Sequence, residues 1–138
     1  MTAMQLWMAK EIIQSAELEA HRIGVPMVIS VVDAGGNLTA CYKMDHALLA
    51  SIDIATNKAW TSVAMKMPTA DLAKMARPGG SLYGIHSTNR NRIVLFGGGI
   101  PLLQQHLLIG GLGVSGGSVE QDVLVAEAVR VNFERTYG

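Results

Sequence analysis

The apolar positions near the N-terminus follow the period of a helix and then change to a strand pattern. Six apolar residues are spaced alternately by three and four positions: Leu6, Ala9, Ile13, Ala16, Ala20 and Ile23. This spacing predicts a helix over residues 4–23 with one apolar stripe. Thr2 is its candidate N-cap, and Gly24 is its expected end, since glycine readily takes the left-handed cap conformation. The β-branched run 27–32 predicts a strand buried on both faces.

A hairpin and a second helix are predicted next. The turn 33–37 and the alternating segment 38–44 complete a β-hairpin with the first strand. Asp45 is the candidate cap of a helix over residues 47–65, whose predicted core stripe is Leu48, Ile52, Ala55, Ala59 and Val63. A short helical turn is expected at 70–75. The segment 76–91 is rich in Gly, Ser, Asn and Arg and predicts a long loop, of a length that is usually functional or mobile.

The second half of the chain predicts strands and one final helix. Segments 93–96, 100–103 and 107–114 have strand patterns, and the last two are joined by a turn at 104–106. Ser118 and Gln121 have the spacing of a capping box at the start of a helix over residues 119–136. About five strands, mostly joined as antiparallel hairpins and flanked by helices, predict a fold of the α+β class. Residues 1–138 are expected to form a single domain.

The low content of charged residues indicates self-association. Charged residues make up 16% of the chain and hydrophobic residues 49%, whereas an ordinary domain carries about 25% charged residues. Because so few charges cannot cover the surface of a small monomer, we expect other copies of the chain to cover part of it. The 11 basic residues balance the 11 acidic ones, so a nucleic-acid binder is not expected.

Three further features bear on the class of protein. Cys41 is the single cysteine, which excludes an intrachain disulfide and a thiolate zinc cluster. Lys10 and Glu11 interrupt the first apolar stretch, which is not the pattern of a secretory signal. The uncharged run 93–119 contains glycines, a proline and glutamines, and is therefore typical of strands and turns. We expect a cytoplasmic protein with no membrane segment.

Two of the four histidines are candidate ligands. His21 falls in the last turn of the first helix, where a histidine commonly complements the helix dipole. The alternative is an axial ligand that reaches a flat cofactor at a seam between copies. His46 follows Asp45 at a hairpin-to-helix corner, where it either lines a pocket or is solvated. No two histidines are four residues apart, so no helical metal-binding pair is present.

Other candidate groups lie in the second helix and in the long loop. Arg90 and Arg92, near His86, can bind carboxylates through bidentate guanidinium contacts, although an ordinary wet loop is the simpler interpretation. Lys58 falls among apolar residues, where a desolvated lysine can act as a nucleophile, although snorkelling to the surface is commoner. The Gly-rich run 110–118 can bind an anion or form a turn that caps itself, and the second interpretation is favoured. The residues alone identify no catalytic constellation.

Six ordered blocks match a known family. They are Val31-Val32-Asp33-x-x-Gly36-x-Leu38, Met44-Asp45-x-Ala47, Ser51-x-x-Ile54-Ala55-x-x-Lys58-Ala59-x-Thr61, Pro68-Thr69-x-x-Leu72, Gly98-Gly99-Ile100-Pro101-Leu102, and Ile109-Gly110-x-x-Gly113-Val114-Ser115-Gly116-Gly117-x-x-x-Gln121-Asp122. Through them essentially the whole chain resembles the GlcG/HbpS family, which also supplies the C-terminal domain of PduO-type corrinoid adenosyltransferases. The resemblance does not extend to the adenosyltransferase domain, so that activity is not carried over.

The resemblance carries expectations about fold and ligand. It implies a profilin-like three-layer α/β/α sandwich around a five-stranded antiparallel sheet, assembled into a homo-oligomer, an octamer in some members. It also implies haem binding and, in one branch, iron and haem sensing or haem degradation. In PduO-type domains a histidine near the N-terminus is the implied iron ligand, and His21 is the candidate here. The family usually has Gly where this chain has His46, which makes that corner bulkier and more polar.

These observations lead to three hypotheses. The first is a stand-alone, homo-oligomeric domain that binds haem or a related tetrapyrrole, with His21 as the iron ligand, His46 beside the cofactor, and Arg90 or Arg92 near the propionates.

The second is an enzyme acting on a small metabolite of glycolate, diol or glycerol utilisation. Its site would lie between Asp33, Asp45, His46 and Lys58, with the junction 110–118 binding an acid group. The third is an accessory subunit without a small ligand.

Overall fold

The computed structural model describes residues 3–138. The helices are α1 (Leu6–Ile23), α2 (Ala50–Met65), α3 (Thr69–Ala76) and α4 (Val119–Tyr137). The strands are β1 (Val28–Asp33), β2 (Leu38–Lys43), β3 (Gly99–Gln104) and β4 (Leu107–Ser115). Two short 3-10 helices, Ile85–Ser87 and Asn89–Asn91, lie between α3 and β3. Thr2, the candidate cap of α1, lies outside the described residues.

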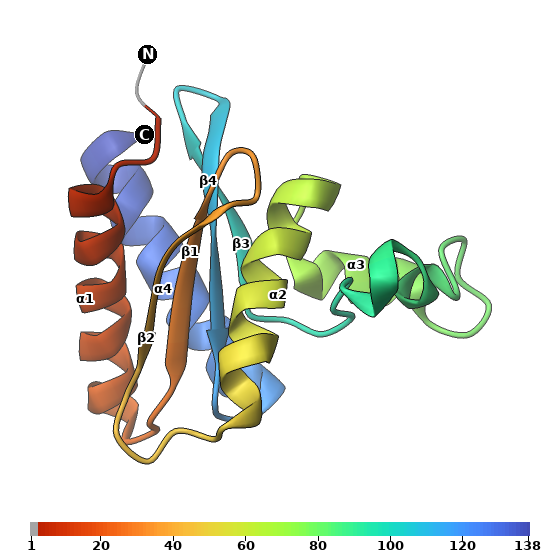
Figure 1. Cartoon of the computed structure of the whole chain (residues 1–138), viewed down its shortest axis with the longest axis horizontal. Helices are drawn as coiled ribbons and strands as arrows, with labels where there is room; N and C mark the ends of the chain where they lie inside the picture. The colour runs from red at the N-terminus through yellow and green to blue at the C-terminus, as the bar shows by residue number, and fades with distance from the viewer. Residues whose placement is uncertain (1–2) are drawn as a thin grey trace.

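The strands form one antiparallel sheet in the order β2-β1-β4-β3. Helices α1 and α4 cover one face of the sheet and α2 covers the other, while α3 and the following segment project away from the body (Figure 1). The predicted α+β class and the three layers are confirmed. The β1–β2 hairpin, the burial of β1 on both faces and the capping box of α4 are confirmed as well.

The predicted fifth strand is wrong, because the sheet in the described part of the chain has four strands. Residues 93–96 make no ladder with any strand and are attached to α2 instead. The Val94 N–H donates to Thr61 Oγ1 at 3.1 Å, and Thr61 Oγ1 donates to the Arg92 carbonyl at 3.4 Å. A short apolar run is equally suited to a strand and to an extended segment packed on a helix, and only the neighbouring helix distinguishes them.

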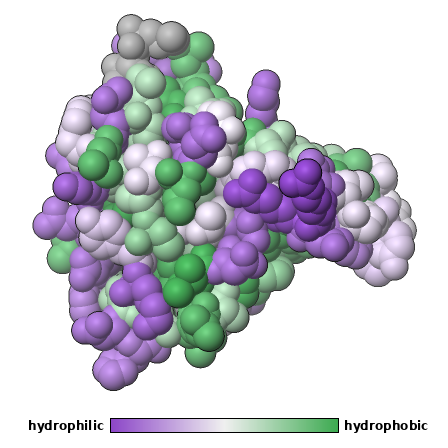
Figure 2. All heavy atoms as spheres, in the orientation of Figure 1, coloured by the Kyte–Doolittle hydropathy of each residue, from purple (hydrophilic) through white to green (hydrophobic). Residues whose placement is uncertain are grey.

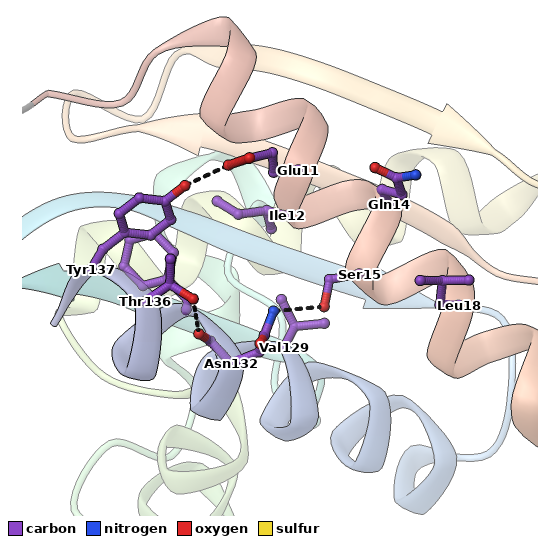
Figure 3. Close-up of a pocket in the computed structure, with 10 residues that line it drawn as sticks. Glu11, Ile12, Gln14, Ser15, Leu18, Val129, Asn132, Thr136 and Tyr137 are labelled. Atoms are coloured by element: carbon purple, nitrogen blue, oxygen red, sulfur yellow. Dashed lines mark hydrogen bonds between the residues drawn. The ribbon is translucent and has the colours of Figure 1, made fainter.

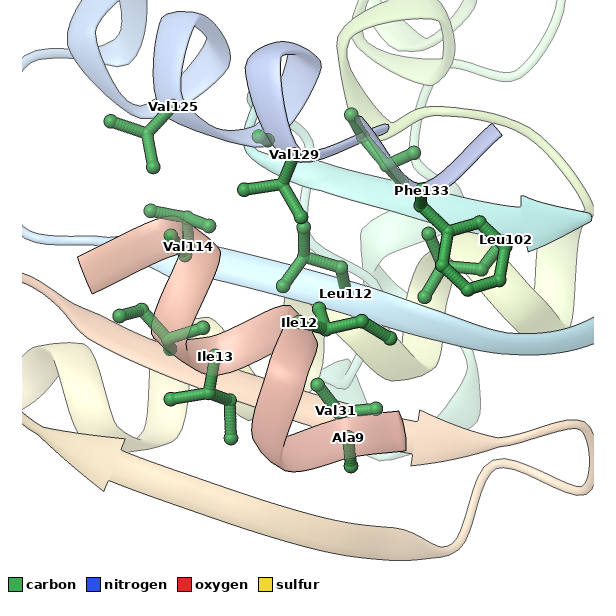
Figure 4. Packing of buried hydrophobic residues seen from close by; sticks show 14 of the residues in the cluster. Ala9, Ile12, Ile13, Val31, Leu102, Leu112, Val114, Val125, Val129 and Phe133 are labelled. Atoms are coloured by element: carbon green, nitrogen blue, oxygen red, sulfur yellow. The ribbon is translucent and has the colours of Figure 1, made fainter. Parts of the chain in front are cut away.

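The larger hydrophobic core lies between the sheet and the layer of α1 and α4 (Figure 4). Four of the six predicted stripe residues of α1 are buried there: Ala9, Ile13, Ala16 and Ala20. Leu6 is 52% exposed, and Met8 and Ile12 are buried in addition. The helix thus packs against three elements, α4, β1 and β2, and buries a wider face than one stripe.

The predicted face of α2 is partly wrong. The helix begins at Ala50 and not at residue 47, and Asp45 does not cap it. Leu48 and Ile52, predicted to be in the core, are 62% and 38% exposed. The side that faces the sheet carries mainly small or polar residues: Ser51, Ala55, Lys58, Ala59, Thr61, Ser62 and Val63.

Glycines in the sheet explain why the side of α2 that faces it carries small residues. A Cβ at Gly113 would lie 1.9 Å from the Ala55 carbonyl oxygen, and one at Gly99 would lie 2.4 Å from the Lys58 carbonyl oxygen. The backbone of α2 therefore lies directly against β3 and β4, and no room remains for large side chains between them.

None of the helices within residues 3–138 has both the length and the apolar character needed to cross a membrane.

The glycine contact predicts a large loss of stability for Gly113→Ala. The added methyl group must push α2 away from β4, and overpacking of this kind costs about 3 kcal/mol. Chemical denaturation at fixed protomer concentration measures the loss. Gly35→Ala is the control, because a Cβ there meets first the flexible end of Asn37, at 3.0 Å. Equal stability of the two variants would show that α2 does not lie against the strand.

Candidate functional site

Two of the four histidines line one hollow, which we call the histidine hollow. Its volume is about 490 Å³, and it lies between the end of α1, the entry to β1 and the corner that follows β2. It is lined by Glu17, Ala20, His21, Gly24, Val25, Pro26, Lys43, Met44, Asp45 and His46. The fold thus brings together two imidazoles that are 25 positions apart in the sequence.

His21 reaches the hollow from the last turn of α1. Its side chain is 67% exposed, and its Nε2 lies 3.6 Å from Oε2 of Glu17, one helical turn earlier. The helix ends at Gly24, which has φ 72° and donates to the carbonyls of Ala20 and His21. The imidazole is therefore held near a carboxylate at a helix C-terminus, with an open side toward the hollow.

His46 reaches the hollow from a strained corner. Its φ is 72°, in the left-handed region that few residues other than glycine adopt, although histidine is among those enriched there. This is the position at which glycine is usual in the family that the sequence resembles. The backbone keeps the glycine-like conformation, and the side chain adds an imidazole to the lining of the hollow.

Arg90 and Arg92 line a different hollow, which we call the arginine hollow. It has a volume of about 510 Å³ and is lined by Asp53, Asn57, Trp60 and residues 89–92. Its lining comes from α2 and from the segment before β3, whereas α1 contributes to the histidine hollow. Helices α1 and α2 lie on opposite faces of the sheet (Figure 1). Within one chain, the structure does not bring the two arginines to His21.

Lys58 is neither solvated nor snorkelling. Its side chain is fully buried, and its Nζ donates to the Val114 carbonyl at 2.8 Å and to Asp122 Oδ2 at 3.0 Å. Burial lowers the pKa of Lys58, although the charge of Asp122 opposes the shift. Burial also raises the pKa of Asp122, against the effect of Lys58 and of the Gly117 N–H. Sequence reasoning missed this partner; an internal lysine on a helix that packs against a sheet is itself a sign that a buried acid lies nearby.

The site proposed for a metabolite-converting enzyme is not assembled. Asp33 accepts hydrogen bonds from the Gly35 and Asn37 N–H groups, at 3.0 and 2.9 Å, and shapes the β1–β2 turn. Lys58 is enclosed, and Asp45 and His46 belong to the histidine hollow. The four residues therefore serve three different places in the fold.

The Gly-rich junction before α4 caps itself, as the favoured interpretation predicts. The Ser118 N–H donates to Gln121 Oε1 at 2.9 Å, and the Gln121 N–H donates back to Ser118 Oγ at 3.1 Å. The Gly117 N–H donates to Asp122 Oδ1 at 2.9 Å. These donors are occupied by the protein, which removes the basis for an anion site here.

A third hollow, of about 310 Å³, lies between α1 and α4 and contains none of the predicted site residues (Figure 3). Polar contacts cross it: the Tyr137 hydroxyl donates to the Glu11 carboxylate, and the Asn132 amide donates to Ser15 Oγ at 3.4 Å. It lies between the middle of α1 and the C-terminal part of α4 and shows no convergent chemistry.

Residues 4–130 match the protein family described as "Haem degrading protein HbpS-like". The chain belongs to the HbpS-like family. The resemblance drawn from the six sequence blocks is thereby confirmed.

Relatives of this HbpS-like chain include one protein of similar length and a much longer one. An uncharacterized 15.0 kDa protein in the dhaT-dhaS intergenic region of Citrobacter freundii is 48% identical over 119 residues, which are 86% of this chain and 84% of that protein. The corrinoid adenosyltransferase PduO of the same organism is 48% identical over 117 residues, which are 85% of this chain but only 35% of PduO. A crystal structure described as a PduOC:Heme complex has a TM-score of 0.90 and 42% identity, and the match covers 94% of each chain.

The buried ion pair of Lys58 and Asp122 predicts that removing one partner destabilises this HbpS-like chain more than removing both charges. Lys58→Met should cost about 3–5 kcal/mol of the free energy of unfolding, because it leaves the Asp122 carboxylate buried without its partner. The double variant Lys58→Met, Asp122→Asn should lose less, because no buried charge remains. Both losses are measured by denaturant titration.

The matched control is Lys74→Met. Lys74 Nζ lies 4.0 Å from Asp71 Oδ1, and both side chains are exposed. The expected cost of Lys74→Met is about 0–1 kcal/mol of the free energy of unfolding. A double variant no more stable than Lys58→Met alone would contradict the ion-pair argument.

Proposed function

We propose that this chain binds haem or a related tetrapyrrole in the histidine hollow. The observation that carries the proposal is that His21 and His46 line the same hollow. The family description and the related structure of a haem complex support it. The volume of about 490 Å³ lies within the range of roughly 300–1,000 Å³ that is usual for small-molecule sites.

The lining of the hollow fits a flat cofactor that carries a metal. Val25, Pro26 and Met44 offer apolar surface, and the two histidines add nitrogen ligands. A tetrapyrrole supplies four ligands to its own iron, so a single protein imidazole is enough to hold it. When bound, haem would supply an iron centre that binds a further ligand or exchanges an electron.

His21 is the proposed iron ligand, and Glu17 is its positioning residue. A histidine that ligates a metal commonly gives the N–H of its other ring nitrogen to a carboxylate, which fixes the ring and its tautomer. Glu17 is placed for this, one turn from His21 on the same helix. His46, which lines the same hollow, is proposed to contact the cofactor without being its first ligand.

We further propose that a second copy of the chain closes this hollow. Leu48 and Leu49, directly after His46, are 62% and 81% exposed. Hydrophobic side chains also gather at the lower end of α2 in Figure 2. A flat ring in an open hollow leaves one face in water, and an apolar surface next to it is suited to cover that face. The low charge content of the chain supports the same assembly.

Haem titration tests the ligand. With the wild-type chain, the Soret band should show an imidazole-ligated haem, and His21→Ala should lose that spectrum and bind at least about tenfold more weakly. Glu17→Gln should keep the ligand but weaken binding. His86→Ala is the control, since His86 is exposed and lies outside the histidine hollow. An unchanged spectrum and affinity in His21→Ala would sink the assignment.

His46→Gly separates the imidazole from the backbone at the corner. Because glycine accepts φ 72° without strain, the variant should be as stable as the wild type or more so, by up to about 1 kcal/mol. Haem affinity should nevertheless fall, since one wall of the hollow is lost. Thermal unfolding and haem titration measure the two effects. Haem binding equal to wild type would remove His46 from the site.

Sedimentation velocity tests the assembly. Leu48→Glu with Leu49→Glu should shift the protein to smaller species, because four-carbon apolar groups are replaced by charges that resist desolvation. The control carries Leu103→Glu and Leu107→Glu on the β3–β4 hairpin, where both leucines are also exposed. If the wild type sediments as a monomer at micromolar concentration, the proposed closure by a second copy is wrong.

A further inference from the structure

The arginine hollow is organised by one face of α2 that the proposed haem site does not use. Asp53, Asn57 and Trp60 follow one another at helical spacing and are not among the buried residues of α2 that face the sheet. The loop that carries Arg90 and Arg92 lies against them, because Thr61 binds the backbone on either side of Ile93. Strongly hydrophilic side chains gather where α3 and the segment that follows it project from the body of the molecule (Figure 2).

The guanidinium of Arg92 is fixed by two contacts, with Asn57 and with Trp60, and Asn57 is itself held by Asp53. Asn57 Nδ2 donates to Asp53 Oδ2 at 3.1 Å, which orients the amide. The Asn57 Oδ1 then accepts from Arg92 Nε at 3.0 Å. The guanidinium lies over the Trp60 ring, 4.5 Å from its centroid. Position, plane and direction of the guanidinium are thus set before any ligand arrives, which reduces the entropy lost on binding.

The terminal nitrogens of this arginine are left for a ligand. Among residues 3–138, neither Arg90 nor Arg92 forms an ion pair with a carboxylate, and the one side-chain hydrogen bond of Arg92 uses its Nε. Partial burial lowers the pKa of Arg92, and the charge of Asp53 opposes this shift. A partly desolvated guanidinium whose terminal nitrogens form no ion pair can bind an anion, even though Asp53 lies in the same hollow.

Arg90 is brought to the same hollow by an unusual backbone. Asn89, Arg90 and Asn91 have φ values of 50°, 58° and 60°, three left-handed residues in succession without a glycine. Each costs free energy that the surrounding structure must supply, and such strain is concentrated at functional sites. The result is a second cation in the lining of the hollow that contains Arg92.

We propose that the arginine hollow binds a small organic carboxylate, held by the two terminal nitrogens of Arg92 and by the charge of Arg90. Two arginines and Asp53 give the hollow a net charge of +1, which matches a monoanion and leaves a phosphate dianion only half neutralised. The planar fork of the guanidinium also fits the two oxygens of a carboxylate. This site is separate from the histidine hollow and does not depend on haem binding.

The two tryptophans of the chain provide a test with an internal reference. The protein is labelled with 5-fluorotryptophan and titrated with sodium acetate, against sodium chloride at equal ionic strength. The fluorine signal of Trp60 should shift and saturate in the millimolar range with acetate only. The signal of Trp7, on α1, should stay in place. Trp7→Phe assigns the two signals.

Conservative variants then test whether the paired terminal nitrogens of the Arg92 guanidinium hold the carboxylate. Arg92→Lys keeps the charge but removes the two parallel donors, and should weaken acetate binding about tenfold. Arg90→Lys should have a smaller effect, because it keeps the charge. Arg135→Lys, on the exposed end of α4, is the matched control and should bind acetate like the wild type.

Three outcomes would overturn the proposal. The first is a Trp60 signal that does not saturate with acetate. The second is tighter binding of inorganic phosphate than of acetate. The third is weaker haem binding by Arg92→Lys without any effect on acetate, which would assign the arginine to the carboxylates of haem. Failure of His21→Ala to affect haem would leave this site unaffected, so the two proposals fail separately.

Discussion

Helix α2 lies directly on a strip of glycines. This close contact determines which side chains of α2 are buried and which are available to line the surface hollows. With no side chain at Gly99, Gly111 or Gly113, the helix backbone approaches β3 and β4 within contact distance. The residue of α2 that points toward the sheet at its centre is Lys58, and it has no route to solvent. Its charge is neutralised by Asp122 from the first turn of α4, which ties the helix on one face of the sheet to a helix on the other.

The same contact turns the remaining side chains of α2 outward. Asn57 and Trp60 are then available to Arg92, and Thr61 attaches the loop backbone. The segment that follows β2 must also cross the end of the sheet to reach α2, which brings His46 opposite the end of α1. Two hollows on different sides of the sheet result from the placement of a single helix. Their linings also differ: one combines two imidazoles with apolar groups, and the other contains two arginines, an aspartate and three asparagines.

Strain lies at both hollows. His46 has a left-handed backbone at one, and residues 89–91 have it at the other. In each case a residue other than glycine keeps a conformation that glycine would adopt without cost, and in each case the side chain gained is one that binds ligands, an imidazole or a guanidinium. The conformation is not confined to the hollows, because Lys66 at the end of α2 and Gln105 and His106 in the β3–β4 turn also have positive φ values.

The sequence by itself determined the local elements and the family. Periodicity located α1, β1 and α4, the capping box at Ser118 was readable from spacing, and six blocks identified the HbpS-like relationship. The predicted strand at 93–96 and the predicted burial of Leu48 and Ile52 were wrong, because hydrophobicity describes a residue and not the surface that it meets. Only the tertiary structure decided that glycines face α2, that Lys58 pairs with Asp122, and that His21 shares a hollow with His46 and not with Arg92. Those outcomes depend on which segments become neighbours, and contacts between residues far apart in the chain leave no periodic signal in it.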